Sequence, residues 1–348
     1  MQNENFISQL KNLYKDAFPI DSASFVEYFF NRQIKTESLS NVATVSNDNQ
    51  LVSAGYIIKK PAIIFNRQET AYYLTALATF SEFRGKGYFN ELIQKMLNNL
   101  YDREVPFCFL YPFNHEFYLK YGFNTISFCD KVVLAGGKKC VETLYQANSQ
   151  ISSDVISRLV GLEREIWKSD INKRNNKLVF GREELQQKIA EYAVDNIGLY
   201  TYGYTQEVNS IFAYCFKNNE KVFFYGVQEK DRESFFHLEY FKGLKIFDFG
   251  GDNMPYIQAR VVNIKSALEK VPIIGTKQIS IKIIDNIMAE NNGVFLVMPN
   301  KDRSGNIVKR IDSEKTDYSF EIGDLTKLLL CGNGVVVAKQ RNVFIDQY

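Results

Sequence analysis

A short basic turn rich in glycine is the first place in this sequence where the residue types suggest chemistry. It runs from Arg84 to Tyr88 and joins an apolar run to a helical pattern. Gly85 and Gly87 let the backbone adopt positive φ and come close to a ligand. Free N–H groups at a helix start attract an anion, and Lys86 and Arg84 add positive charge. The turn therefore predicts a pyrophosphate site or, alternatively, an ordinary strand-to-helix turn with solvated basic side chains.

Motifs of several other chemistries are missing from the sequence. It contains no P-loop motif (GxxxxGKS or GxxxxGKT), no G-x-G-x-x-G dinucleotide fingerprint and no GxSxG hydrolase elbow. Only two histidines, His115 and His237, are present, and the five cysteines are scattered without CxxC spacing. These counts argue against a zinc site and a disulfide scaffold, and they suit a reducing compartment. We therefore expect no metal.

Length and composition indicate an ordinary globular protein of two or three domains. The chain has 348 residues, of which 45% are apolar and 24% charged, and its net charge is +2. Such a charge gives no electrostatic reason to expect nucleic acid or an anionic membrane as a partner. No apolar run approaches the roughly 18 residues of a transmembrane helix, and the polar N-terminus has no signal-peptide core. We therefore expect a cytoplasmic protein.

A strand, the glycine turn, a helix and a second strand are predicted to position the candidate phosphate site. Residues 73–80 form a β-rich apolar run, and residues 106–110 form a second one. Between them, apolar side chains recur at i, i+3, i+4 and i+7 over residues 89–100, which predicts an amphipathic helix. This pattern is a right-handed βαβ unit with parallel strands. A short helical turn that carries Tyr118 follows it.

This unit resembles the GNAT acetyltransferases and, more narrowly, the enhanced intracellular survival (Eis) family of three-domain N-acetyltransferases. The resemblance rests on ALATFSEFRGKGYFNELI and, more specifically, on PFCFLYPFNHEFYLKYGF. The GNAT signature Gln/Arg-x-x-Gly-x-Gly/Ala is met at Arg84 and Gly87, but Phe89 stands where the family has a small residue. The resemblance extends more weakly over nearly the whole chain.

The resemblance implies acetyl-CoA as cosubstrate. In GNAT proteins the two central parallel strands splay apart, and acetyl-CoA lies in the wedge between them. The turn would hold its pyrophosphate, and backbone groups at the end of the first strand would pair with its pantetheine arm. The implied cofactor-binding residues are Leu77, Ala78, Thr79, Arg84, Gly85, Lys86, Gly87, Tyr88 and Asn114.

Two catalytic residues are also implied by position within the family pattern. Tyr118 would be the general acid, because a tyrosine with a pKa of about 10 is protonated at pH 7 and can donate to the departing thiolate. The α-carboxylate of Tyr348 would be the base, and burial would raise its pKa from about 3.5. Tyr121 is a competing acid whose place before a glycine suggests packing. His115 could act as a base or be an ordinary hydrogen-bonded histidine.

The acceptor side is less clearly marked in the sequence. Aromatic residues of a predicted helix over residues 22–31, among them Phe25 and Tyr28, would wall an acceptor pocket or simply pack in the core. Asp346 could attract a cationic substrate or be a solvated acid. Arg260 could pair with a carboxylate that the sequence does not identify.

The expected fold is α/β (α+β), with a GNAT fold at the N-terminus, a degenerate GNAT-like domain in the middle and a sterol-carrier-like α/β domain at the end. The predicted bounds are a catalytic domain over residues 1–136, a shortened scaffold over 137–246 and a sterol-carrier-protein-like domain with the tail over 247–348. The last could bind lipid or be only a structural core. The expected helices are residues 6–17, 22–31, 153–168, 183–193, 264–270 and 323–330. The expected strands outside the central unit are residues 41–45, 51–58, 125–134, 199–204, 208–216, 221–228, 258–264, 275–284 and 293–298.

The sequence therefore predicts an N-acetyltransferase that moves an acetyl group from acetyl-CoA to a primary amine by direct attack in a ternary complex. By the resemblance, the acceptor is a polyamine-like or aminoglycoside-like cation or a lysine side chain, and the enzyme is a homo-oligomer, a hexamer. Two alternatives remain open. The chain could be an acyl-CoA- or lipid-binding module with little or no transferase activity, or an acetyltransferase whose acceptor is a partner protein.

Overall fold

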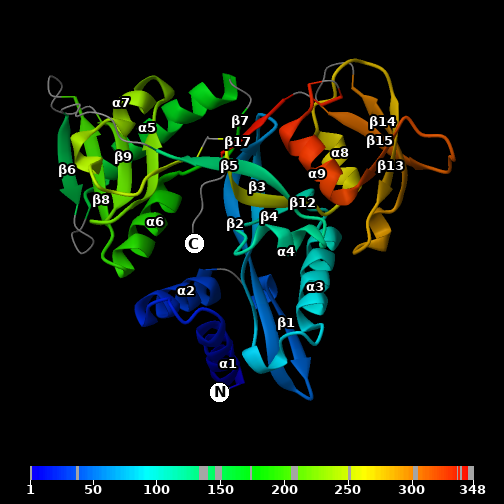
Figure 1. Cartoon of the computed structure of the whole chain (residues 1–348), viewed down its shortest axis with the longest axis horizontal. Coiled ribbons are helices and arrows are strands. Elements are labelled where there is room, and N and C mark those ends of the chain that lie inside the picture. Colours follow the sequence, from blue (N-terminus) through cyan, green and yellow to red (C-terminus); the bar gives the residue numbers. More distant parts are fainter. Residues whose placement is uncertain are drawn as a thin grey trace.

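A computed structural model describes residues 2–36, 39–132, 140–145, 151–172, 175–204, 211–249, 252–300, 305–334, 336–337 and 339–343. The last described strand ends at Val343, so the predicted site residues Asp346 and Tyr348 lie outside the described residues. The fold is mixed α/β, as expected, and Figure 1 shows three groups of strands and helices side by side.

The N-terminal part of the chain is built on a long twisted hairpin and the predicted βαβ unit. The turn at Asp48 and Asn49 and a second turn at Phe65 and Asn66 have positive φ, which Asp and Asn tolerate better than Phe does. The strands β3 and β4 are parallel and the helix between them is α3, as predicted. The elements of this part are α1 (Gln2–Ala17), α2 (Ala23–Thr36), β1 (Val42–Asn47), β2 (Gln50–Ile64), β3 (Arg67–Thr79), α3 (Tyr88–Asp102), β4 (Phe107–Leu110), α4 (His115–Leu119) and β5 (Asn124–Lys131).

Helices cover both faces of this sheet. The apolar face predicted for α3 is fully buried at Leu92, Met96 and Leu100, where it packs with alternate residues of β2 and β3 such as Ile57 and Leu74. The opposite set of strand residues packs with α1 and α2. Alternation of side chains along a strand explains why one hairpin serves two cores. Among the described residues, no helix is both long and apolar enough to cross a membrane.

The large sheet recruits strands from later parts of the chain. Nine of the described strands belong to it, in the order β11-β5-β12-β4-β3-β2-β7-β17, with β1 also paired to β2. The recruited strands are β7 (Asn175–Leu178), β11 (Phe247–Asp248), β12 (Met254–Val261) and β17 (Arg341–Val343). β12 is hydrogen-bonded antiparallel to both β4 and β5, so it separates them. Its residues were expected to open the third domain.

Two smaller sheets flank the large one. The central sheet is antiparallel in the order β10-β9-β8-β6, and the C-terminal sheet has the order β15-β14-β13-β16 in the described residues. Figure 1 shows the central unit in green on one side and the C-terminal unit in yellow to orange on the other. Their elements are β6 (Val141–Tyr145), α5 (Ser153–Asn172), α6 (Arg182–Val194), β8 (Gly198–Gly203), β9 (Ile211–Lys217), β10 (Val222–Val227), α7 (Arg232–Phe236), α8 (Ile264–Lys270), β13 (Ile279–Ile284), β14 (Gly293–Pro299), β15 (Asn306–Ile311), β16 (Tyr318–Glu321) and α9 (Ile322–Cys331). Short 3-10 turns are η1 (Leu39–Asn41), η2 (Ser81–Phe83), η3 (Glu229–Asp231), η4 (Glu239–Phe241) and η5 (Ala289–Asn291).

Candidate functional site

A wedge opens in the middle of the large sheet. β3 and β4 pair at only two positions, Tyr72 with Cys108 and Tyr73 with Phe109. Beyond Tyr73, β3 continues to Thr79 and pairs with β2, whereas β4 pairs with β12 on its other edge. In the described part of the chain no strand pairs with the remaining edge of residues 74–79. The two parallel strands therefore diverge after their first contact, as the family resemblance implies.

A β-bulge re-aims the backbone of β3 beside this wedge. Ala54 pairs with Ala78 and Tyr56 with Thr75, so two residues of β3 face the single Gly55 of β2. Ala76 in the bulge has φ 48°, a left-handed conformation. A Cβ at Gly55 would lie 2.6 Å from a methyl group of Leu77, which explains the glycine.

The predicted pantetheine contacts lie along this bulged end of β3. The carbonyl of Ala78 accepts a 2.7 Å hydrogen bond from Ser53 Oγ, and that of Thr79 accepts a 3.0 Å bond from Arg84 Nε. The backbone of Leu77 sits in the bulge itself. The pairing of these three residues with a pantetheine arm stays a prediction.

The glycine turn has the geometry of an anion cradle. Gly85 and Gly87 have φ of +77° and +89°, and a Cβ on either would meet nothing within 4 Å. Gly87 is the N-cap of α3, and its carbonyl accepts the first bonds of the helix, from Asn90 and Glu91. No described residue accepts a hydrogen bond from the backbone N–H groups of residues 85–89. These groups are open to a ligand at the positive end of the α3 dipole.

The two basic side chains of the turn play different parts. Arg84 folds back toward the end of β3, where its Nε binds the Thr79 carbonyl and its Nη2 lies 3.7 Å from Asp16 Oδ2. Asp16 also accepts hydrogen bonds from Ser81. The Lys86 ammonium lies 5.1 Å from the centre of the Phe83 ring. Arg84 therefore anchors the turn to the strand, while Lys86 keeps its charge at the surface.

Tyr118 lies next to this cradle. It is 4% exposed, and its ring makes edge contacts with Phe89 in the first turn of α3 and with Phe123. Burial, and to a lesser extent the nearby Tyr121, raises the pKa of Tyr118 well above its ordinary value. Among the residues that the structure describes, none hydrogen-bonds the Tyr118 hydroxyl, although that oxygen is not fully enclosed. The phenol is therefore protonated and available to a ligand.

The other polar residues of α4 are engaged with the protein. Asn114 is the N-cap of α4 and accepts hydrogen bonds from the N–H groups of Glu116 (2.9 Å) and Phe117 (3.2 Å). His115 Nδ1 lies 3.4 Å from Thr125 Oγ1, and burial lowers its pKa, so the ring is neutral at pH 7. These contacts are structural, and the predicted cofactor role of Asn114 stays a prediction.

Tyr121 is a packing residue rather than a second free acid. Its hydroxyl donates a hydrogen bond to Asn90 Oδ1 in the first turn of α3, and its ring packs 5.7 Å from the Phe89 ring. The Tyr121 hydroxyl is therefore already engaged, which argues against Tyr121 as the competing general acid. Asn90 was not singled out from the sequence, because an asparagine in a helix carries no signal of such a contact.

The predicted acceptor residues lie on the opposite face of the sheet. Phe25 is buried and packs 6.4 Å from Phe29, whose ring contacts Tyr56 beside the bulge. Tyr28 instead points toward the central unit and donates a 3.1 Å hydrogen bond to the Gln187 carbonyl of α6. Phe25 is thus a core residue near the bulge, and Tyr28 lies at the contact with α6.

Sequence reasoning missed a cavity of about 1150 Å³ beyond this contact. The tip of the β2–β3 hairpin, β7, α5 and α6 surround it. Its lining includes Arg32, whose guanidinium lies 3.5 Å from the buried carboxylate of Glu191. Charged residues of this kind look like ordinary helix surface in the sequence, so only the packing of the two units reveals the cavity.

Comparison with known families assigns both ends of the chain. Residues 2–126 match the GNAT acetyltransferase domain, and residues 264–340 match the sterol carrier protein domain. No curated protein matches the sequence.

Solved structures share the fold over most of their length. A probable N-acyltransferase from Enterococcus faecalis is 17% identical with a TM-score of 0.73, covering 95% of this chain and 88% of that one. A GCN5-related N-acetyltransferase from Kribbella flavida is 13% identical with a TM-score of 0.73 and coverage of 99% and 96%. Eis1 from Mycobacterium abscessus is 13% identical with a TM-score of 0.63 and coverage of 95% and 90%. The chain therefore combines an N-terminal match to the GNAT acetyltransferase domain with a C-terminal match to the sterol carrier protein domain, and it shares the fold of these solved structures, Eis1 among them.

Proposed function

We propose that this protein is an N-acetyltransferase that moves an acetyl group from acetyl-CoA to a primary amine. One observation carries the proposal: the wedge between β3 and β4, the open N–H groups of residues 85–89 and the free hydroxyl of Tyr118 lie together. The narrow pantetheine arm of acetyl-CoA fits a wedge lined by backbone groups. Its pyrophosphate fits a helix N-terminus with open N–H groups. The acceptor class is a polyamine-like or aminoglycoside-like cation or a lysine amine.

The residues of this chain supply binding and proton transfer. The cradle binds the pyrophosphate, and the bulge at Ala76 offers backbone groups near the place where the thioester carbonyl would lie. As the amine nitrogen bonds to the acetyl carbon and the carbon–sulfur bond breaks, the Tyr118 hydroxyl gives its proton to the departing sulfur. The amine loses its own proton to a base. No covalent enzyme intermediate is needed.

The proposed base is the α-carboxylate of Tyr348. The last described strand, β17, is held to β5 by a 3.0 Å hydrogen bond from Ser127 Oγ to the Asn342 carbonyl. On the same strand Thr125 contacts His115, the first residue of α4. Five residues follow Val343 in the sequence, and a fully extended segment of that length spans at most about 18 Å. A segment of this length attached at Val343 can extend to the α4 region.

A second candidate function is acyl-CoA or lipid binding with little or no turnover. The match of residues 264–340 to the sterol carrier protein domain favours it. An acetyltransferase acting on a partner protein uses the same site with a lysine acceptor. The assembly proposed from the resemblance is a hexamer, which sedimentation of the purified chain would measure.

One experiment separates these functions. Release of free thiol from acetyl-CoA is measured across a panel of polyamines, aminoglycosides and lysine peptides, for the full chain and for a chain lacking Tyr348. We expect amine-dependent release that collapses in the shortened chain, with acetyl-CoA binding by calorimetry unchanged. Release that survives the deletion removes the tail as base. Binding without release for any amine replaces the transferase with the binding module.

A further inference from the structure

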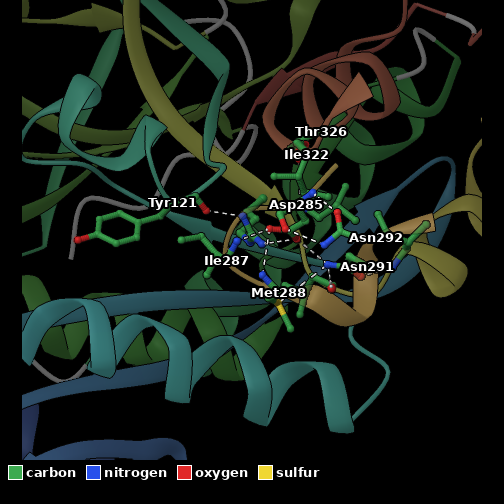
Figure 2. Close-up of polar contacts among 12 residues, drawn as sticks. Tyr121, Asp285, Ile287, Met288, Asn291, Asn292, Ile322 and Thr326 are labelled. Atoms are coloured by element: carbon green, nitrogen blue, oxygen red, sulfur yellow. Dashed lines mark hydrogen bonds and ion pairs between the residues drawn. The ribbon is translucent and has the colours of Figure 1, made fainter. Parts of the chain in front are cut away.

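A buried arginine links the catalytic region to the sterol carrier protein domain. Arg260 lies on β12, outside both matched ranges, and is 0% exposed. Its Nη2 lies 2.6 Å from Asp285 Oδ2, and its Nη1 donates a hydrogen bond to the carbonyl of Tyr121. Figure 2 shows Tyr121 and Asp285 approaching this point from opposite sides. One side chain therefore joins the end of α4 to the C-terminal unit.

The carboxylate of Asp285 is fully satisfied. Its Oδ1 accepts hydrogen bonds from the N–H groups of Ile287 (3.0 Å) and Met288 (3.1 Å), and its Oδ2 accepts one from Asn291 Nδ2 (2.9 Å) as well as from Arg260. Burial alone would raise the pKa of Asp285, but the Arg260 charge and these hydrogen bonds outweigh it and lower the pKa. The carboxylate is therefore ionised, and the Arg260 charge is balanced inside the protein.

The chain around Tyr121 is shaped to receive Arg260. Gly122 has φ +78°, and a Cβ there would overlap Arg260 Nη1 and come within 2.5 Å of Ile322 at the start of α9. The main chain of Gly122 therefore packs directly against the guanidinium and the C-terminal unit. Such a close approach is possible only for glycine.

Tyr121 is in turn bound to both parts of the proposed active site. Its N–H donates to the Tyr118 carbonyl (3.1 Å), and the N–H of Phe123 donates to the same carbonyl (3.3 Å). Its hydroxyl binds Asn90 in the first turn of α3, next to the cradle. A shift of the Tyr121 main chain thus moves Tyr118 relative to the first turn of α3.

We propose that Arg260 and Asp285 are positioning residues for the acetyl transfer, holding the Tyr121 carbonyl so that Tyr118 stays aligned with the cradle. The sterol carrier protein domain is then a working part of the active site. This inference rests on the proposed function. A cavity of about 240 Å³ beside the pair, lined by Lys120, Gly122 and Asp285 among others, leaves room for this segment to shift when the pair is broken.

A second ion pair between the same two units provides a matched control. Glu69 at the start of β3 lies 2.7 Å from Lys270 on α8, with side chains 21% and 32% exposed. This pair does not contact α4. Glu69→Gln therefore removes an ion pair between the units without touching Tyr121.

The test compares Asp285→Asn and Arg260→Lys with Glu69→Gln in the full chain. Asn keeps the shape of Asp285 but leaves the Arg260 charge unbalanced. Lys keeps the charge, but a single ammonium cannot reach Asp285 and the Tyr121 carbonyl as a guanidinium fork does. We expect kcat to fall by roughly tenfold to a hundredfold in both variants, since a misplacement of about 1 Å has that effect, with KM for acetyl-CoA changed less than about threefold. Glu69→Gln should leave kcat within about twofold.

Two further readouts separate positioning from general loosening. In a Tyr118→Phe background, Arg260→Lys should lower kcat no further, because the residues act through Tyr118. Hydrogen exchange of residues 115–123 should quicken in Arg260→Lys and Asp285→Asn but not in Glu69→Gln. Equal losses of kcat in both backgrounds, or unchanged exchange at 115–123, would overturn the inference. If the unmodified chain shows no turnover with any amine, the proposed function fails, and the exchange experiment alone decides whether the pair holds this segment.

Discussion

Replacement of Gly87 by alanine tests the anion cradle at the position where the structure makes the sharpest statement. Gly87 has φ +89°, and a Cβ there meets nothing within 4 Å, so the substitution leaves packing intact. The left-handed conformation of an alanine costs about 1–2 kcal/mol. For a domain of this size, such a cost lowers the melting temperature by roughly 2–8 °C. The added methyl group, however, stands on the open face from which the N–H groups of residues 85–89 must bind an anion.

Gly243 provides the matched control, because its φ is +86° and a Cβ there also meets nothing within 4 Å. Gly243→Ala carries the same backbone cost, but it lies in the central unit. Isothermal calorimetry should show acetyl-CoA binding about 10- to 100-fold weaker in Gly87→Ala, since each hydrogen bond to a charged group contributes about 1.5–3 kcal/mol. The affinity for acetyl-CoA should be unchanged in Gly243→Ala. Equal affinity in the two variants would falsify the placement of the pyrophosphate at this helix start.

The remaining predictions concern the acid, the anchor and the packing around Arg260. Tyr118→Phe should lower kcat at least about a hundredfold with near-normal acetyl-CoA binding, and an unchanged kcat would remove Tyr118 as the acid. Because burial raises the pKa of Tyr118, its proton stays in place as the pH rises, so kcat should not decline between about pH 8 and 10; a decline that disappears in Tyr118→Phe would contradict this. Arg84→Ala should raise KM for acetyl-CoA about tenfold through the loss of charge and of the bond to Thr79, and an unchanged KM counts against the site. Gly122→Ala should destabilise the chain by about 4–7 kcal/mol, combining the left-handed cost with disruption of the buried ion pair. Gly275→Ala, with φ +91° and open space, should cost only about 1–2 kcal/mol, and similar urea midpoints for the two would refute the overlap with Arg260.

The parts of the fold that the sequence predicts well are those set by local pattern. The α3 face and the parallel β3–β4 unit follow from apolar spacing and the glycine turn, and the structure confirms them. The wedge was expected only from the family resemblance, because nothing local tells two strands to separate. In the structure β3 and β4 pair at only two positions, and β12 occupies the other edge of β4.

β7, a strand that the sequence pattern does not predict, has the composition of a loop. β7 begins with two asparagines, a residue type that is depleted in strands. The fold accommodates Asn176 by giving its side chain partners: its Oδ1 accepts from the Phe65 N–H (2.8 Å), and its Nδ2 donates to Asn342 Oδ1 (2.8 Å). These partners lie more than 100 residues away in the chain, so a local pattern cannot reveal them.

The site residues also divide into those that a sequence pattern reveals and those that depend on partners distant in the chain. The glycines of the turn are recognisable from their local spacing, whereas Tyr118 is singled out only by its position in the family pattern. For Arg260 the sequence predicted a carboxylate partner without identifying it. The structure shows Asp285, and it adds the Tyr121 carbonyl, which no side-chain pattern encodes.

The insertion of β12 between β4 and β5 has a consequence for how the chain is made on the ribosome. When β5 has emerged, the neighbour that it shares with β4 is still about 130 residues from being synthesised. At roughly 5–20 residues per second, the nascent sheet waits about 6–26 s with two strand edges unpaired. Exposed edges of this kind invite pairing with other chains. The acetyltransferase domain is therefore a late-folding unit despite its place at the N-terminus, and a chain cut after residue 132 should depend on chaperones or aggregate.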